Sequence, residues 1–217
     1  MSMNFGREQA LLRQRLTAKA SEELATRQAA QHGDGLKFLG ASDEEVLAAA
    51  TDLAELYPEM GRAQMTAFVR TLWGSKTHEL RCAGIEVLVI RVSLLEPQDM
   101  PFVESLLKDT EIDAVNERIA TNVLGPLICK NKKLWKELGK LAKEANESLR
   151  RAAVHATMAP VTTDNTVFNR FEALVTPLLA EEDPLLQTAI DEVLTAASEL
   201  HEAAVTAFAS EHDRKIK

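Results

Sequence analysis

Turn signals divide the chain at intervals of roughly 15 to 20 residues, and each segment between them has the apolar periodicity and length of one helix. Runs of alternating β-branched residues, which would indicate strands, are absent from the 217 residues. The sequence therefore predicts an all-α fold of about ten or eleven helices, on the order of one per segment. The breaks are "HGDGLKFLGASDEE", "YPEMG", "WGSKTHE", "LEPQDMP", "LKDTE", "CKNKK", "KEANES", "APVTTDN" and "EEDP".

The even spacing of these helices favours an α-solenoid of HEAT-like antiparallel helix pairs, with about 40 residues in each pair. We expect one domain over residues 1–217, in which residues 1–32 form a helical cap at one end. Ser42 is the expected N-cap of the helix that follows it, with Glu45 three residues later. Composition alone fits a compact helical bundle equally well.

The charge is acidic overall but uneven along the chain. The formal net charge is −8, yet residues 130–151 hold eight basic residues against three acidic ones. Such a basic segment is compatible with phosphate binding at one place, and it is also typical of solvated helix faces. Both readings stay open at this point. Lys130, Lys132, Lys133, Arg150 and Arg151 are the candidates for contacts with DNA phosphates.

Other common classes of site leave no pattern in this sequence. The five histidines are scattered without metal-ligand spacing, and neither a glycine-rich phosphate loop nor a nucleophile elbow is present. We therefore expect no metal and no cofactor. Cys82 and Cys129 lie in apolar helical contexts and are expected to be reduced core thiols. Without a signal peptide or a long apolar run, the expected location is cytoplasmic, with no membrane partner.

Several separate motifs resemble one known family. They are "KFLGASDEEVLAAATDLAE", "FVRTLWGSKTHELRCAGIEVL", "MPFVESLLKD", "ATNVLGPLI" and "SLRRAAVHATM", in that order over roughly residues 34 to 200. This sequence resembles the AlkD-type alkylpurine DNA glycosylases, the DNA alkylation repair family of HEAT-like repeats. In that pattern, His78, Glu79 and Arg81 open a helix with buried pairing to a neighbouring helix.

The resemblance implies hydrolysis of the N-glycosidic bond of positively charged N3- or N7-alkylated purines. Such a base leaves without a general acid, and a carboxylate beside the sugar stabilises the developing oxocarbenium charge. In the family, an aspartate supplies this charge, two tryptophans pack against the backbone of the lesion nucleotide, and an arginine holds phosphate. The resemblance therefore makes alkylated duplex DNA the expected partner.

The family's Trp-Trp-Asp-x-Val-Asp motif, counted back from Leu124-Gly125, falls on residues 112–117. Ile112 and Asp113 stand in place of the tryptophans of this motif, and Glu117 takes the place of the catalytic aspartate. The further tryptophan position is Glu192, whereas the arginine is retained as Arg151. A glutamate carboxylate would be displaced by about an ångström, which can lower a rate on the order of 100-fold.

Asp113 also has a simple structural interpretation. Thr110 to Asp113 fits a Ser/Thr-x-x-acid helix start, which would make Thr110 the N-cap and Asp113 a first-turn acid. Two functions remain open on the sequence alone. One is a DNA-binding repair protein in which Glu117 supports weak, altered or lost glycosylase activity. The other is a non-enzymatic HEAT-like scaffold that binds a protein partner.

Overall fold

The computed structural model describes residues 3–33 and 35–214, and its regular structure is helical. Within these residues an isolated bridge between Lys37 and Thr77 is the only β-type pairing. The labelled helices α7 and α8 are joined without a break, and a single turn joins α10 to α11. With each of these two pairs counted as one helix, the described residues hold eleven helices, which confirms the predicted all-α fold.

The chain divides into two compact units, residues 1–95 and residues 96–217. The predicted single domain over residues 1–217 requires that these two units associate into one, and it stays a prediction. Both cavities described below lie within the second unit, so their geometry depends on that unit alone.

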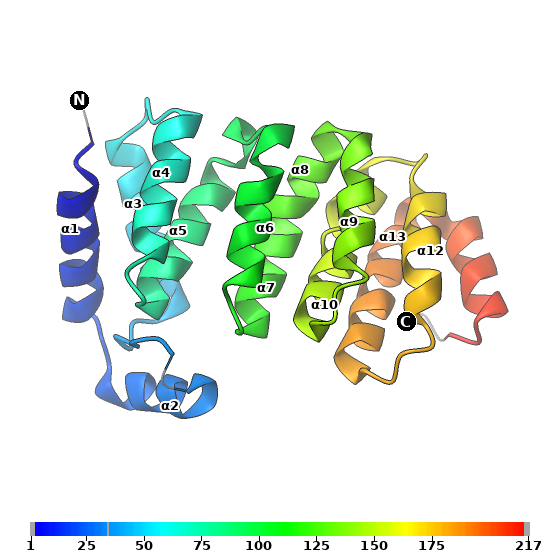
Figure 1. The fold of residues 1–217 in the computed structure, drawn as a ribbon, viewed down its shortest axis with the longest axis horizontal. Helices are drawn as coiled ribbons and strands as arrows, with labels where there is room; N and C mark the ends of the chain where they lie inside the picture. The colour runs from blue at the N-terminus through cyan, green and yellow to red at the C-terminus, as the bar shows by residue number, and fades with distance from the viewer. Residues whose placement is uncertain (1–2, 34, 215–217) are drawn as a thin grey trace. The chain divides into compact units, whose positions relative to one another are not determined.

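The first unit is built on α5, which packs against both α3 and α4, with α1 packed on all three (Figure 1). Leu12 and Leu16 of α1 are buried in this contact, whereas α2 has no buried residue. Ser42 accepts a hydrogen bond from the amide of Glu45, so the predicted N-cap of α3 is confirmed. The helices are α1 Phe5–Ala18, α2 Glu22–His32, α3 Asp43–Leu56, α4 Arg62–Trp73 and α5 His78–Ile90, followed by a 3-10 turn at Val92–Leu94.

A buried carboxylate fixes the loop that precedes α3. Glu79, only 1% exposed, accepts hydrogen bonds from the amide of Leu39 at 2.9 Å and from the amide of Gly40 at 2.7 Å. The expected pairing with a neighbouring helix is found at Arg81, whose Nε donates to the carbonyl oxygen of Trp73 in α4 at 3.0 Å, whereas Glu79 binds loop backbone. Gly40 has a φ of +86°, and a Cβ there would lie 2.1 Å from the carbonyl oxygen of Ser21. Only glycine fits this position.

In the second unit, α10 packs against α7, α9 and α13, and α11 packs against α8 and α13. Leu149, Val154 and Phe171 are among the buried residues of its core. The helices are α6 Met100–Lys108, α7 Asp113–Ile119, α8 Gly125–Lys130, α9 Trp135–Leu141, α10 Glu147–His155, α11 Met158–Thr163, α12 Phe168–Val175 and α13 Pro184–Glu211. Short 3-10 turns cover Pro97–Asp99, Lys132–Leu134 and Thr176–Leu178.

A π-helical segment, Ala120–Leu124, joins α7 to α8. Pro126 follows it at the start of α8 and has no amide hydrogen, so the α-helical hydrogen-bond pattern cannot continue unchanged through this point. A Cβ at Gly125 would lie 3.0 Å from the carbonyl oxygen of Ala156. The absence of a side chain at Gly125 therefore allows this run to approach the α10–α11 turn closely.

The two tryptophans are buried, whereas one of the two cysteines is exposed. Trp73 and Trp135 are 7% and 8% exposed and belong to the core. Both cysteines are free thiols, but Cys129 is exposed, so its prediction as a core thiol is wrong. The last turn of α8 carries Cys129 to the rim of a cavity instead. None of the described helices combines the length and apolar composition needed to cross a bilayer.

Candidate functional site

A cavity of about 150 Å³ lies between α7, α10 and α13 in the second unit. Four of the residues singled out in the sequence line it together, namely Asp113, Glu117, Arg151 and Glu192. They come from three different helices, and up to 79 positions of sequence separate Asp113 from Glu192. The remaining lining residues are Asn116, Ser148, Ala152, His155, Leu185, Thr188 and Ala189.

Each of the three helices contributes one face to this cavity. The residues from α10 are spaced at i, i+3, i+4 and i+7, beginning at Ser148 and ending at His155. The residues from α13 have the same spacing, beginning at Leu185 and ending at Glu192. Such residues lie one above another on a single helix face. The cavity is therefore formed where three helix faces meet, and the short helix α7 contributes its first turn.

An ion-paired chain of three residues crosses one side of the cavity. The guanidinium of Arg151 donates from Nη2 to Oδ1 of Asp113 at 2.6 Å and from Nη1 to Oδ2 of Asp183 at 2.8 Å. The hydroxyl of Ser148 donates to the same oxygen of Asp113 at 2.7 Å. Asp183 also caps α13, since its Oδ1 accepts from the amide of Leu185. Arg151 thereby links the starts of α7 and α13 to α10.

The predicted capping of α7 by Thr110 is wrong. The helix begins at Asp113 with Ile112 as its N-cap residue, and no side chain caps it. The hydroxyl of Thr110 instead accepts a hydrogen bond from the amide of Ile112, two residues later, which closes a turn before the helix. Asp113 is still a first-turn acid, but Arg151 and Ser148 hold its carboxylate.

The charge pairing changes the ionisation of both aspartates. Burial acts to raise the pKa of Asp113, but hydrogen bonds from Ser148 and Arg151 outweigh it and lower that pKa below its usual range. Burial also acts to raise the pKa of Asp183, but hydrogen bonds from Arg151 and from the amides of Leu186 and Leu185 outweigh it and lower that pKa. A carboxyl group with a depressed pKa stabilises the fold above its unfolded-state pKa, about 3.9 for aspartate. That contribution is lost as the pH falls through the lower, folded-state value.

Arg151→Ala is expected to lower the free energy of unfolding of the second unit by about 2–4 kcal/mol, because it leaves the enclosed carboxylate of Asp183 without its cation. Asp113 adds little to this figure, since its side chain is half-exposed and solvent screens its charge. Urea denaturation at pH 7 measures the loss. As the pH falls below about 3.9 and through the lowered folded-state pKa values of the two aspartates, the difference between wild type and variant should shrink, since protonation removes their charges. A difference that is independent of pH would contradict the ion-pair explanation.

Beneath this chain, Asn116 is 2% exposed and holds a fixed orientation. Its Nδ2 donates to the carbonyl oxygen of Thr110 at 3.2 Å and to the hydroxyl of Ser148 at 2.8 Å. Its Oδ1 is enclosed and has no hydrogen-bond partner in the part of the chain that the structure describes. Asn116 therefore supports Ser148, which in turn supports Asp113. Ile112, by contrast, is 8% exposed and does not line the cavity, so it belongs to the core.

The other side of the cavity carries Glu117 and Glu192, both exposed, with His155 between the helices that bear them. Burial lowers the pKa of His155, whereas the charges of Glu117 and Glu192 act to raise it and that of Arg151 to lower it. His155 is therefore neutral near pH 7. With three carboxylates against one guanidinium, the cavity lining is negatively charged at that pH.

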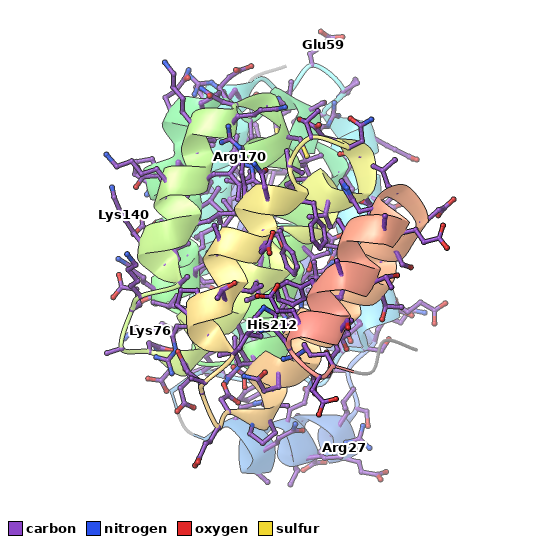
Figure 2. All side chains as sticks on the ribbon, turned by 90° about the vertical axis from the view of Figure 1, so that its right-hand side faces the viewer. Arg27, Glu59, Lys76, Lys140, Arg170 and His212 are labelled. Atoms are coloured by element: carbon purple, nitrogen blue, oxygen red, sulfur yellow. The ribbon has the colours of Figure 1, made fainter. Side chains whose placement is uncertain are left out.

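The basic candidates do not gather at this cavity, apart from Arg151. Arg150 pairs with Glu181 at 2.9 Å and donates to the carbonyl oxygens of Glu144 and Ala145. Lys130 and Lys133 are exposed and line neither cavity. Lys140, in the same basic segment, projects outward from α9 and pairs with Glu137 (Figure 2). The surplus of positive charge counted along the sequence is thus partly neutralised by acidic neighbours.

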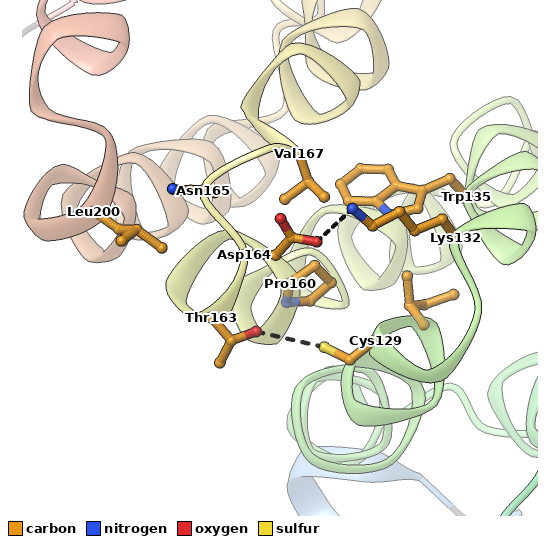
Figure 3. A pocket seen from close by; sticks show the side chains of 10 residues that line it. Cys129, Lys132, Trp135, Pro160, Thr163, Asp164, Asn165, Val167 and Leu200 are labelled. Atoms are coloured by element: carbon orange, nitrogen blue, oxygen red, sulfur yellow. Dashed lines mark hydrogen bonds and ion pairs between the residues drawn. The ribbon is translucent and has the colours of Figure 1, made fainter.

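Lys132 lines a second, more open cavity of about 510 Å³ at the end of α8 (Figure 3). Its ammonium group donates to Asp164 at 2.7 Å and to the hydroxyl of Thr166 at 2.7 Å. Cys129 faces Thr163 across the same cavity, with 3.8 Å between sulfur and hydroxyl oxygen. Burial raises the pKa of the Cys129 thiol, which is therefore protonated near pH 7. The two charged residues that line this cavity, Lys132 and Asp164, pair with each other.

Sequence reasoning missed three residues that line the first cavity, namely Asn116, Ser148 and His155, and it missed Asp183, which pairs with Arg151 beside it. One signal was present, since Ser148, Arg151 and His155 are polar residues at i, i+3 and i+7 of one helix and therefore share a face. Among the described residues, no three His, Cys, Asp or Glu side chains gather as a metal site would require.

Comparisons with known proteins agree on one family. A sequence model described as DNA alkylation repair enzyme matches residues 12–217. The structure is similar to that of a predicted DNA alkylation repair enzyme from Enterococcus faecalis, with a TM-score of 0.74 and 13% sequence identity. That match covers 89% of this chain and 90% of the other, and at this identity it shows the fold alone. A search of curated protein sequences gives no significant match. The chain belongs to the DNA alkylation repair enzyme family.

Proposed function

We propose that this protein binds alkylated duplex DNA and slowly hydrolyses the N-glycosidic bond of N3- or N7-alkylated purines. The observation that carries this proposal is the meeting of Asp113, Glu117, Arg151 and Glu192 in one cavity. Glu117 and Glu192 are the two carboxylates in that cavity that pair with no cation among the described residues. Glu117, which stands at the position of the family's aspartate, is the one proposed to face the sugar.

The negative lining of the cavity supports a cationic substrate. A purine alkylated at N3 or N7 carries a positive charge, and the sugar becomes an oxocarbenium ion as the bond breaks. Carboxylates fixed beside this charge lower its energy in the transition state more than in the ground state. The same carboxylates repel phosphate, so the backbone must be held by lysines outside the cavity, with Lys130, Lys132 and Lys133 as candidates.

The activity is proposed to be weak because the indole contacts are missing. Asp113 and Glu192 stand at positions where the family motif has tryptophan, and Ile112 is buried in the core. Each aromatic platform lost removes about 1–3 kcal/mol of nucleic-acid contact. Arg151 is also held by two aspartates, so its proposed contact with phosphate competes with Asp113 and Asp183.

Binding to a methylated duplex, measured by fluorescence anisotropy across a salt series, tests the DNA-binding part. The affinity is expected to fall steeply with salt, and Lys132→Ala and Lys133→Ala should each reduce the salt slope by about 1. Lys19→Ala is the matched control, because Lys19 is an exposed lysine of the first unit, outside the basic segment. An unchanged slope in both variants would contradict phosphate contacts by these lysines.

A non-enzymatic scaffold that binds a protein partner is the second candidate. It is favoured by the pairing of Lys132, Arg150 and Arg151 with carboxylates, which leaves fewer cations for DNA. The binding experiment separates the two functions, since no measurable DNA binding at low salt would leave only the scaffold.

A further inference from the structure

His155 lies in the cavity with its imidazole ring unengaged. It is the last residue of α10 and is 8% exposed, yet no hydrogen bond joins its ring to another described residue. His201 provides a contrast within the same unit, because its Nε2 is fully enclosed and has no hydrogen-bond partner among the described residues. Neither ring nitrogen of His155 is enclosed in that way. The cavity is therefore the place from which a water or a ligand reaches the ring.

The charged groups around this ring come from three helices. Glu117 lies on α7, Arg151 on α10 and Glu192 on α13, and all three line the cavity with His155. No charged side chain of α6, α9 or the π-helical segment lines it within the described part of the chain. The two glutamates stabilise a positive charge on the ring, whereas burial and Arg151 oppose it. A neutral ring with two carboxylates beside it is suited to accept a proton.

We infer that His155 is the proton acceptor of this cavity and takes the proton of the water that attacks the sugar. This inference rests on the proposed function, because it names a residue for that same reaction. Glu117 then stabilises the oxocarbenium charge, and Glu192 stabilises the imidazolium that forms. The two glutamates and His155 thus have separate tasks in one hydrolysis.

The step balances as an ordinary hydrolysis. The bond between the anomeric carbon and the purine nitrogen breaks, and its electron pair goes to the base, which leaves uncharged because the alkylated purine was a cation. The water oxygen forms a bond to the anomeric carbon, and its proton moves to the imidazole of His155. The imidazolium then returns this proton to solvent once the base has departed. No oxidant, metal or further reactant is consumed.

The test is the pH dependence of single-turnover release of 7-methylguanine from methylated duplex DNA. In the wild type, the logarithm of the rate should rise with pH and reach a plateau once the imidazole is neutral. His155→Gln should release base about 100-fold more slowly at pH 7 and lose this rise. His212→Gln is the matched control, since His212 lies in the same unit and outside the cavity. It should retain the wild-type rate and profile.

The outcomes separate this inference from the proposed function. Release by wild type that is unaffected by His155→Gln, in rate and in pH profile, would overturn the inference alone. Absence of release by wild type would overturn the catalytic part of the proposed function and this inference with it. If His155→Gln does not fold, His155→Asn and an NMR titration of the His155 ring in the wild type replace it. A titration midpoint above the ordinary value of about 6.5 would overturn the inference.

Discussion

Glu117→Gln will lower the single-turnover rate of 7-methylguanine release by about 100-fold, the usual effect of removing one fixed electrostatic group from a transition state. Glutamine keeps nearly the same shape but loses the charge that would face the oxocarbenium ion. Glu117 is exposed on α7 and forms no ion pair among the described residues, so the substitution is expected to leave the fold intact. The rate should fall without a comparable change in DNA affinity.

The matched control for this experiment is Glu111→Gln. Glu111 is also exposed and lies just before α7, but it does not line the cavity. Its substitution should change the rate less than about twofold, since Glu111 lies outside the cavity and solvent largely screens its exposed charge. Equal losses in both variants would indicate a general effect of negative charge rather than a role for the cavity.

Gly40→Ala will lower the free energy of unfolding of the first unit by about 3–5 kcal/mol, from the left-handed backbone conformation and the steric clash together. The backbone at Gly40 has a φ of +86°. The new methyl group would lie 2.1 Å from the carbonyl oxygen of Ser21 and 2.9 Å from the amide nitrogen of Ala25. The loop must then move, which breaks its hydrogen bonds to the buried carboxylate of Glu79.

Urea denaturation followed by circular dichroism measures this loss, with Gly35→Ala as the control. Gly35 lies in the same loop, and a Cβ there would meet no atom within 4 Å. Its substitution should change stability by less than about 1 kcal/mol. If the two variants were equally stable, the close approach at Gly40 would not be a feature of the folded protein.

Most of the fold could be predicted from the sequence because helices are specified locally. Apolar periodicity and turn signals are properties of short segments, and they predicted an all-α fold with about the observed number of helices. Local patterns failed where tertiary contacts compete with them. Thr110 has the spacing of an N-cap, but Arg151 and Ser148 from α10 hold Asp113, and α7 begins at Asp113 with Ile112 as its N-cap residue and without a side-chain cap.

The site could be predicted only in part, for a similar reason. The family motif identified Asp113, Glu117, Arg151 and Glu192 as related positions, and all four line one cavity. It did not identify His155, whose importance depends on which helix faces meet.

The basic segment shows the same limit. Residues 130–151 hold an excess of basic residues, but acidic side chains from later elements pair with three of them. These acidic residues are Asp164, Glu181 and Asp183. Charge pairing between distant segments is a property of the folded chain, so the sequence alone shows only the local excess of basic residues.

The most direct test of the proposed function is release of 7-methylguanine from methylated duplex DNA by the wild-type protein, compared with Glu117→Ala and with a blank that contains no protein. The free base is quantified by mass spectrometry under single-turnover conditions, with protein in excess over lesion. We predict release above the blank by the wild type and a much slower release by Glu117→Ala. Release at the level of the blank by both folded proteins would contradict the assignment of this cavity to glycosidic bond hydrolysis.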